Sequence, residues 1–542
     1  MSPAEQGDPN SRLLILAEAP GKTEMRMGMP LCGPSGDILD EGLKHNKIRR
    51  TDCYILNVWP YLIRKDKNEN FFRPDGTMVW GNKSGFTADG LADAEDTLAR
   101  IQKSGANCIL TLGQQAMALA TDQKTAVMKH RGSIYEGLDR VAGRKTVGSI
   151  HPSYVLRGNY VSRYTLYADM ARAWEEAQTP TLSLPLRNIH IRPSLDEVLH
   201  FIADCRDAGI VSTDLEVINH QVACFSLCYD PSEAMTVPLM DETYGHFWSL
   251  DEEHKIWNAY AGLMGDESVV KVNQNLIGFD APFLTVQNRI RVRGRLEDTM
   301  IAQHIMYPEF PKGLDYICSI HTREPYYKDE GKIWKNAGGD WPQFWRYCAK
   351  DAIVALEAWH VLEAEMDAGG FRETYEMTLR LSDPLLYMTV AGLAVDKEKL
   401  ALAREAVGAE LEAKKAELRQ IADFNPLSSQ QCMKYFYGTK GITPYLSTQT
   451  GRPTADDKAM ARIFRRYNLR EAKLVQEIRA LSKLKNTYIE VALDGDGRLR
   501  CSWNARGTWT GRLSSSQTIF GTGMNLQNLH PMFKGFIVAD PD

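Results

Sequence analysis

The chain has 542 residues, which is enough for three or four domains of ordinary size. Hydrophobic residues make up 44% and charged residues 25%, a composition typical of a soluble globular protein that buries several cores. The net charge of −5 excludes a basic chain overall, but a sum over several domains hides local basic patches.

Three sequence features argue against a membrane or secreted protein. No apolar run is long enough to cross a bilayer, and the start MSPAEQGDPNSR lacks the apolar core of a signal peptide. The ten cysteines are scattered without CxxC spacing, which is typical of reduced thiols rather than of disulfides or zinc ligands. We therefore expect a cytoplasmic protein with no membrane partner.

Residues 1–180 form the first of three predicted segments. Apolar runs at 13–17, 53–59, 107–112 and 145–150 predict strands, and the stretch 88–103 predicts a helix between them. Strands that alternate with helices imply an α/β domain with a largely parallel sheet. A join that contains prolines at 180 and 185 marks the end of this segment.

Two further segments follow, at residues 185–370 and 371–542. The second starts with predicted strands at 209–213 and 222–229 and continues with helices. The third is strongly helical, since its stretch 398–421 is rich in the helix formers Ala, Glu, Lys and Leu. The expected fold class is therefore a multi-domain α/β protein with a mainly α-helical C-terminal segment.

Four acidic residues of the second segment are candidates for one metal site. Asp214 and Glu216 follow an apolar strand, where alternate residues point to the same face. Asp280 ends the run NQNLIGFD, and Asp351 ends YCAKD, with Tyr347 one helical turn before it. Phosphodiester hydrolysis by two divalent ions requires such carboxylates, because magnesium and manganese prefer oxygen ligands. Solvated surface acids are the simpler alternative for any one motif.

These three motifs, in this order, resemble the DEDD superfamily of 3′–5′ exonucleases, in the subtype with a tyrosine in the third motif. The resemblance implies a ribonuclease H-like α/β domain in which the four acids bind two magnesium or manganese ions and Tyr347 positions the attacking water. The stretch EDTMIAQHIMYPE, with Asp298, is also similar to the family. The implied substrate is a single-stranded DNA 3′ end, and a ribonuclease of the same superfamily is an alternative.

Basic and hydrogen-bonding residues gather in the third segment. The stretch 457–485 holds nine Lys or Arg against three Asp or Glu, which suits a DNA backbone but is also typical of a solvated helix face. The later runs TWTGRLSSS and NLQN offer a guanidinium with hydroxyl and amide groups, which suit contacts to phosphates and sugars.

The same runs, with LLYMTVAGLAVDKEKL, FNPLSSQQ, TGRPTADDKAM and RALSKLKNTY, resemble the thumb and the thumb-to-palm passage of family A DNA polymerases. The resemblance implies that this segment grips a primer–template. The residues that it implies as DNA contacts are Lys483, Lys485, Thr510, Arg512, Ser514, Ser515, Asn525, Gln527 and Asn528.

The sequence stops at FIVADPD, before the palm aspartates and the fingers helix of that family. Nucleotide addition needs those carboxylates, so we do not expect this chain to polymerise DNA alone. A second polypeptide that carries palm and fingers is the expected partner, and a truncated sequence is the alternative. A non-catalytic DNA clamp or docking subunit of such a split polymerase is the alternative function.

A second ordered set of motifs occupies the first segment. It comprises AEAPG with Glu18, GMPLCGPSG with Leu31, YILNVWP with Asn57, LTLGQQA, and IHPSY with His151. Together they resemble the family 4 uracil-DNA glycosylases, which cleave the N-glycosidic bond of a flipped base. The resemblance implies that Glu18, or a water that it holds, supports the reaction. It also implies that Asn57 reads uracil and that His151 stabilises developing charge.

Two departures from that family favour an inactive first domain. Leu31 stands where the family has a stacking phenylalanine, and the four cysteines of the family's iron–sulfur cluster are missing, so no cluster is expected. We therefore expect DNA binding or docking without base removal, with an active glycosylase as the alternative. Because some tailed phages fuse such a domain to a family A polymerase, the expected location is the cytoplasm of an infected bacterium.

Overall fold

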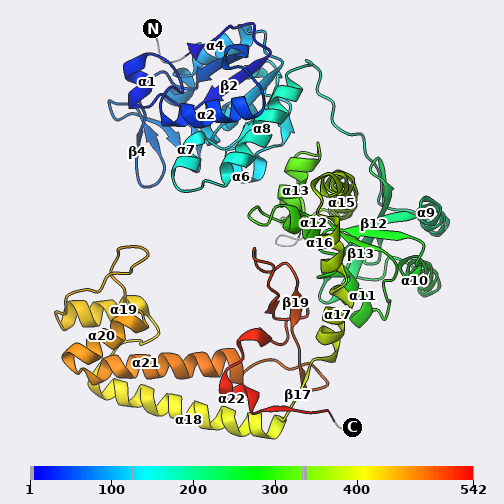
Figure 1. Cartoon of the computed structure of the whole chain (residues 1–542), viewed down its shortest axis with the longest axis vertical. Coiled ribbons are helices and arrows are strands. Elements are labelled where there is room, and N and C mark those ends of the chain that lie inside the picture. Colours follow the sequence, from blue (N-terminus) through cyan, green and yellow to red (C-terminus); the bar gives the residue numbers. More distant parts are fainter. Residues whose placement is uncertain (1–4, 125, 332–333, 335–338, 541–542) are drawn as a thin grey trace. The chain divides into compact units, whose positions relative to one another are not determined.

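The computed structural model describes residues 5–124, 126–331, 334 and 339–540. The chain divides into two compact units, Met1–Glu376 and Met377–Asp542 (Figure 1). The first unit contains two six-stranded sheets, which Figure 1 draws in shades of blue and of green. The second unit is mainly helical and runs from yellow to red.

The first sheet has the strand order β1-β3-β2-β8-β10-β9, and its four central strands are parallel. The four predicted strands are confirmed, three of them with ends one or two residues shorter than expected. The strands of this sheet are β1 (Glu5–Gln6), β2 (Leu13–Ala17), β3 (Cys53–Asn57), β8 (Cys108–Leu112), β9 (Ile134–Tyr135) and β10 (Lys145–Ser149).

Alternate residues of β2 face two different cores. Leu13 and Ile15 pack in the core that contains residues of α2 and α8, whereas Leu14 and Leu16 pack in the core that contains residues of α4 and α5. Because both faces are covered, the run is apolar throughout instead of alternating. The helices here are α1 (Lys22–Met27), α2 (Pro34–His45), η1 (Arg50–Asp52), α5 (Gln114–Thr121), α6 (Val127–His130), η2 (Asp139–Val141), α7 (Pro152–Leu156) and α8 (Ser162–Glu176).

The predicted helical stretch 88–103 is confirmed, but it is divided into two helices. The chain forms α3 (Ala88–Ala92) and α4 (Glu95–Lys103), with a turn between them at residues 93–94. The turn is anchored because the Asp93 carboxylate accepts hydrogen bonds from Arg73 at 2.6 Å and from the Tyr61 hydroxyl. A small antiparallel sheet, which the sequence pattern did not indicate, lies in the same region. Its strands are β4 (Arg64–Lys65), β5 (Phe71–Phe72), β6 (Met78–Gly81) and β7 (Gly85–Phe86).

The second sheet of the first unit is mixed and has the order β11-β14-β13-β12-β15-β16. The predicted strands at 209–213 and 222–229 are confirmed as β12 and β13, which form a long antiparallel pair. The strands are β11 (Asn188–His190), β12 (Ile210–Ile218), β13 (Gln221–Asp230), β14 (Glu233–Pro238), β15 (Val270–Asn273) and β16 (Leu296–Asp298).

Helices cover both faces of this second sheet. Cys224 of β13 packs against Trp345 and Cys348 of α15, while its neighbour Phe225 stacks on Tyr260 of α10 with ring centroids 4.1 Å apart. Successive residues of a strand point to opposite faces, so α15 and α10 lie on opposite sides of the sheet. The helices are α9 (Leu195–Ala208), α10 (Leu250–Gly265), α11 (Asp280–Gln287), α12 (Thr299–Met306), α13 (Leu314–His321), α15 (Trp341–Gly369) and α16 (Arg372–Leu379).

The second unit is built around two long helices that pack side by side, α18 (Lys397–Ile421) and α21 (Arg470–Lys483) (Figure 1). The predicted helix over 398–421 is therefore confirmed. Within the described residues, the helices are too short or too polar to span a bilayer. The remaining elements are α17 (Ser382–Ala391), β17 (Leu393–Val395), α19 (Ser429–Met433), η3 (Lys434–Thr439), α20 (Asp457–Tyr467), η4 (Leu484–Ile489), β18 (Arg498–Leu499), β19 (Ser502–Asn504), β20 (Ser514–Ser516), η5 (Leu526–Asn528), α22 (Pro531–Lys534) and β21 (Ile537–Val538).

Candidate metal centre and nucleic-acid sites

Three carboxylates converge between β12 and α15. Asp214, Glu216 and Asp351 each present an oxygen atom, and these three atoms lie within 4.8 Å of one another. Asp214 and Glu216 are two residues apart on β12, so the strand points both side chains to the face that α15 covers. Glu216 and Asp351 are buried and Asp214 is half-buried. Such a group of oxygen donors suits a hard divalent cation.

Asp280, the fourth predicted acid, lies beside this group but is not one of its three members. It is the first residue of α11, is 2% exposed, and accepts a hydrogen bond from the Leu215 backbone N–H at 3.2 Å. Burial and then the charge of Asp351 raise the pKa of Asp214 well above its ordinary range, and Asp280 adds to this shift. Burial likewise raises the pKa of Asp280. Part of each pKa shift comes from repulsion between neighbouring carboxylates, and a bound cation would offset this repulsion.

Tyr347 lies one turn before Asp351 on α15, as the sequence predicted. Its side chain is buried, and burial followed by the charge of Asp351 raises the pKa of its hydroxyl. The phenol is therefore neutral at physiological pH and able to donate a hydrogen bond. Asp298 has a different position, because its carboxylate caps α12 and accepts from the N–H groups of Met300 at 2.9 Å and Ile301 at 3.2 Å.

Sequence reasoning missed two residues that contact the acidic group. The Tyr327 hydroxyl donates to Oδ1 of Asp351 at 2.6 Å, and the Lys328 ammonium donates to Oδ2 at 2.5 Å. The same ammonium lies 4.8 Å from the centre of the Tyr347 ring. Both residues come from the run EPYYKDE, in which neither spacing nor periodicity marked them.

The predicted residues of the first segment lie where parallel strands end. Glu18 directly follows β2, Asn57 ends β3, and His151 precedes α7 just after β10. These carboxyl ends share one edge of the sheet, which is where open α/β sheets bind ligands. Burial raises the pKa of Glu18 to about 7. Leu31 is 5% exposed and belongs to the same buried cluster as Leu13.

Electrostatics keep His151 neutral at physiological pH. Burial, and then the positive charge of Arg157, lower the pKa of His151 to about 4. Its Nδ1 accepts from the Ser153 backbone N–H at 3.1 Å, which caps the short helix α7. A further acid that sequence reasoning missed is Glu24, which is 7% exposed and accepts from the Gly33 N–H at 2.8 Å. A Cβ at Gly33 would lie 2.8 Å from that carboxylate, so a larger residue there would push the Glu24 side chain aside.

In the second unit, the two polar runs predicted to contact DNA meet each other. The Ser515 hydroxyl of β20 donates to the Asn525 side chain at 2.9 Å, and the Gln527 amide donates to the Leu513 carbonyl at 2.9 Å. Thr510 and Arg512 stay exposed in the preceding loop. The remaining predicted contacts are Lys483 at the end of α21, Lys485 in η4, Ser514 in β20 and Asn528 in η5.

The basic stretch 457–485 divides into structural and exposed cations. Arg470 of α21 pairs with Glu417 of α18 at 2.7 Å, and Arg479 of α21 donates to the carbonyls of Pro426 and Ala455 at 2.9 and 2.6 Å, so both anchor α21 to neighbouring segments. Lys458, Arg465 and Arg466 are exposed on α20. The two alternatives for this run, a solvated helix face and a DNA-binding face, therefore concern only its exposed cations.

Comparison with known proteins assigns the first domain to a protein superfamily. Residues 4–178 match the family model of the uracil DNA glycosylase superfamily. The type-4 uracil-DNA glycosylase of Thermotoga maritima is 30% identical over 153 residues, which cover 28% of this chain and 70% of that protein. The chain belongs to the uracil DNA glycosylase superfamily through this domain. All four predicted pocket residues lie inside the matched part of this glycosylase-superfamily domain.

Residues 397–533 match the family model of DNA polymerase family A. The DNA polymerase I of Rhizobium leguminosarum is 29% identical over 404 residues, which cover 67% of this chain and 38% of that protein. The DNA polymerase of Escherichia phage T5 is 35% identical over 146 residues, or 26% of this chain and 16% of that protein. The chain thus spans well under half the length of these polymerases.

Among solved structures, the POL domain of Pol1 from M. smegmatis has a TM-score of 0.48 and 16% identity, over 63% of this chain and 56% of that chain. Residues 179–396, which carry the acidic group, lie outside both matched family models.

Proposed function

We propose that residues 185–370 are a metal-dependent 3′–5′ DNA exonuclease in a chain related to family A DNA polymerases. The observation that carries this proposal is the convergence of Asp214, Glu216 and Asp351 within 4.8 Å, with Asp280 beside them. Four carboxylates from three elements, gathered at low solvent exposure, are costly to assemble unless cations offset their repulsion. The relationship to DNA polymerase I proteins supports DNA as the substrate.

Each residue has a distinct role in this proposal. A pair of divalent ions, when bound, would activate a water and stabilise charge on the leaving oxygen. Asp214, Glu216 and Asp351 would hold these ions, and Asp280 would complete the set from the start of α11. Tyr347, whose hydroxyl stays protonated, would orient the attacking water by hydrogen bonding.

We further propose that residues 371–542 grip a primer–template, as the family A match over 397–533 supports. Exposed Arg512 and Thr510 would contact phosphates, while the joined Ser515 and Asn525 pair would fix the loop that presents them. A polypeptide with palm and fingers would complete nucleotide addition. Such a protein would act in the cytoplasm where DNA is copied, in our proposal that of an infected bacterium.

For the glycosylase-superfamily domain we propose DNA binding or docking without base removal. Leu31 in place of a stacking aromatic residue, with its side chain buried in the core, supports this role. One observation favours the alternative of an active glycosylase. Glu18, with a pKa of about 7, and a neutral His151 lie at the same sheet edge, which suits acid–base chemistry.

The exonuclease proposal is tested with single-stranded DNA labelled at its 5′ end, in the presence of magnesium. Wild-type chain should shorten the strand progressively from its 3′ end, and Asp214→Ala should abolish this. Asp207→Ala, which removes an exposed acid from α9, is the matched control and should retain activity. A wild-type chain that leaves the strand intact would favour the non-catalytic clamp. Faster degradation of RNA than of DNA would favour the ribonuclease alternative.

A further inference from the structure

A short segment of the first unit contacts both the glycosylase-superfamily domain and the acidic group. We call residues 323–330 the bridging segment; they follow α13 and precede α15. The two central residues of the segment contact one side, and the residues directly before and after them contact the other. Tyr326 and Asp329 contact the glycosylase-superfamily domain, whereas Tyr327 and Lys328 contact Asp351.

On the acidic side, the bridging segment occupies both oxygens of one carboxylate. Tyr327 donates to Oδ1 of Asp351 at 2.6 Å and Lys328 donates to Oδ2 at 2.5 Å. The rings of Tyr327 and Tyr347 lie 5.9 Å apart, so the segment also packs against the tyrosine expected to orient water. Two hydrogen bonds, one of them from a cation, fix the rotamer of Asp351. Tyr327 and Lys328 are thus positioning residues, since they act through Asp351.

On the other side, the glycosylase-superfamily domain holds the backbone and the side chains of the bridging segment. The Tyr326 N–H donates to the Ser133 hydroxyl at 3.1 Å. The Lys129 ammonium lies 3.0 Å from both carboxylate oxygens of Asp329, and the His130 ring meets the Tyr326 ring edge-on at 5.1 Å. These contacts therefore hold the residues directly before and directly after Tyr327 and Lys328 in the chain.

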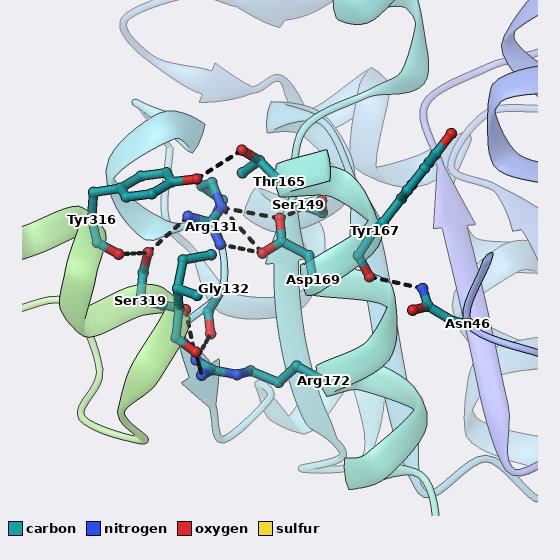
Figure 2. A network of polar contacts seen from close by, with 11 residues as sticks. Asn46, Arg131, Gly132, Ser149, Thr165, Tyr167, Asp169, Arg172, Tyr316 and Ser319 are labelled. Atoms are coloured by element: carbon teal, nitrogen blue, oxygen red, sulfur yellow. Dashed lines mark hydrogen bonds and ion pairs between the residues drawn. The ribbon is translucent and has the colours of Figure 1, made fainter. Parts of the chain in front are cut away.

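The helix that leads into the bridging segment is held by the same domain (Figure 2). Arg131 and Asp169 form a fully buried pair, and a second nitrogen of Arg131 donates to the Ser319 hydroxyl of α13 at 2.7 Å. Arg172 donates to the carbonyls of Ser319 and Ile320, both at 2.8 Å. The last carbonyls of α13 therefore receive their hydrogen bonds from the glycosylase-superfamily domain. The bridging segment begins only two residues after this helix.

We propose that the glycosylase-superfamily domain is a positioning platform for the acidic group, in which Ser133 and Lys129 hold the bridging segment so that Tyr327 and Lys328 keep Asp351 in place. This inference rests on the proposed exonuclease function of that group. It gives the domain a role that needs no base removal. It also makes the Lys328 ammonium a resident cation, which competes with divalent ions for the oxygens of Asp351.

The test uses the full chain and two changes at the platform, Lys129→Ala with Ser133→Ala. With 5′-labelled single-stranded DNA and saturating magnesium, kcat should fall about 3–10-fold while KM for DNA stays unchanged, because Asp351 is misplaced but DNA contacts remain. Lys129→Arg keeps the cation and should retain wild-type kcat. Lys103→Ala, an exposed lysine on α4 away from the bridging segment, is the control.

Manganese binding without DNA provides a readout other than activity. Lys328→Met should bind Mn²⁺ about threefold more tightly than wild type, because it removes the ammonium that contacts Asp351. The platform variant should also bind Mn²⁺ more tightly, because it loosens the segment that holds this ammonium against Asp351. Tighter ion binding with lower kcat is a combination that a general loosening of the fold would not produce. An unchanged Mn²⁺ affinity together with an unchanged kcat in the platform variant overturns the inference.

A double-mutant cycle tests the route through the bridging segment. In a background of Tyr327→Phe with Lys328→Met, the platform changes should have no further effect on kcat, since the link is already cut. Fully additive losses would mean that the platform acts by another route, and the inference would be wrong. If wild type lacks nuclease activity, the proposed function fails, and Mn²⁺ affinity alone then decides whether the platform positions Asp351.

Discussion

Replacing Glu18 by glutamine should remove a pH-dependent loss of stability from the glycosylase-superfamily domain. Burial raises the pKa of Glu18 from 4.5 to about 7, so between these values the folded domain binds more protons than the unfolded chain. Its free energy of unfolding therefore contains a contribution that is fully present below pH 4.5 and is lost as the pH rises through about 7. Glutamine does not ionise and carries no such contribution.

The size of this effect follows from the shift and from the exposure of the carboxylate. One pKa unit is about 1.36 kcal/mol, so the whole shift corresponds to roughly 3 kcal/mol. Glu18 is half-buried, and water beside its carboxylate lowers this to about 1–3 kcal/mol. The stability of Glu18→Gln relative to wild type should therefore increase by that amount between pH 4.5 and about pH 8.

Urea titrations at each pH give the measurement, with the unfolding of β2 and β3 followed by pulsed hydrogen exchange and mass spectrometry. Peptides from these strands report on the unfolding of this domain alone, although the chain has several domains. Glu136→Gln, an exposed glutamate of the same domain, should follow the wild-type profile. Parallel pH profiles for Glu18→Gln and wild type would refute the reasoning that desolvation governs this carboxyl.

Four further outcomes are expected. Chelation of divalent ions should stop degradation of single-stranded DNA, and magnesium or manganese should restore it; degradation that survives chelation contradicts the metal site. A uracil-containing strand should show little or no base release, and efficient release would reverse our proposal for the first domain. Arg512→Ala should weaken primer–template binding about fivefold and reduce the slope of log affinity against log salt by about 1, as measured by fluorescence anisotropy, whereas an unchanged slope would count against a phosphate contact. Mixing with a polypeptide that carries palm and fingers should give nucleotide addition, and an inactive but well-folded mixture would argue against a split polymerase.

Local sequence pattern determined much of the fold. The uninterrupted apolar run Leu13–Ala17 predicted a strand, and the structure forms this strand and buries all five residues. The two-residue spacing of Asp214 and Glu216 predicted a shared face, and the four-residue spacing of Tyr347 and Asp351 predicted one helical stripe. Such inferences succeed because strand and helix periods are properties of the backbone itself.

Local pattern failed where a distant residue decided the outcome. The stretch 88–103 has helical composition, yet the hydrogen bonds from Arg73 and Tyr61 to Asp93 divide it into two helices. The interacting groups are 20 and 32 residues apart in the chain, so no spacing within the stretch predicts their contact.

By itself, then, the sequence determined several of the strands and helices, the three family resemblances and the four candidate acids. Only the tertiary structure decided what surrounds those acids. Tyr327 and Lys328 reach Asp351, and Arg131 pairs with Asp169, because separate segments fold against one another. Periodicity describes a residue's face within its own element, whereas a hydrogen bond or an ion pair depends on where two elements meet.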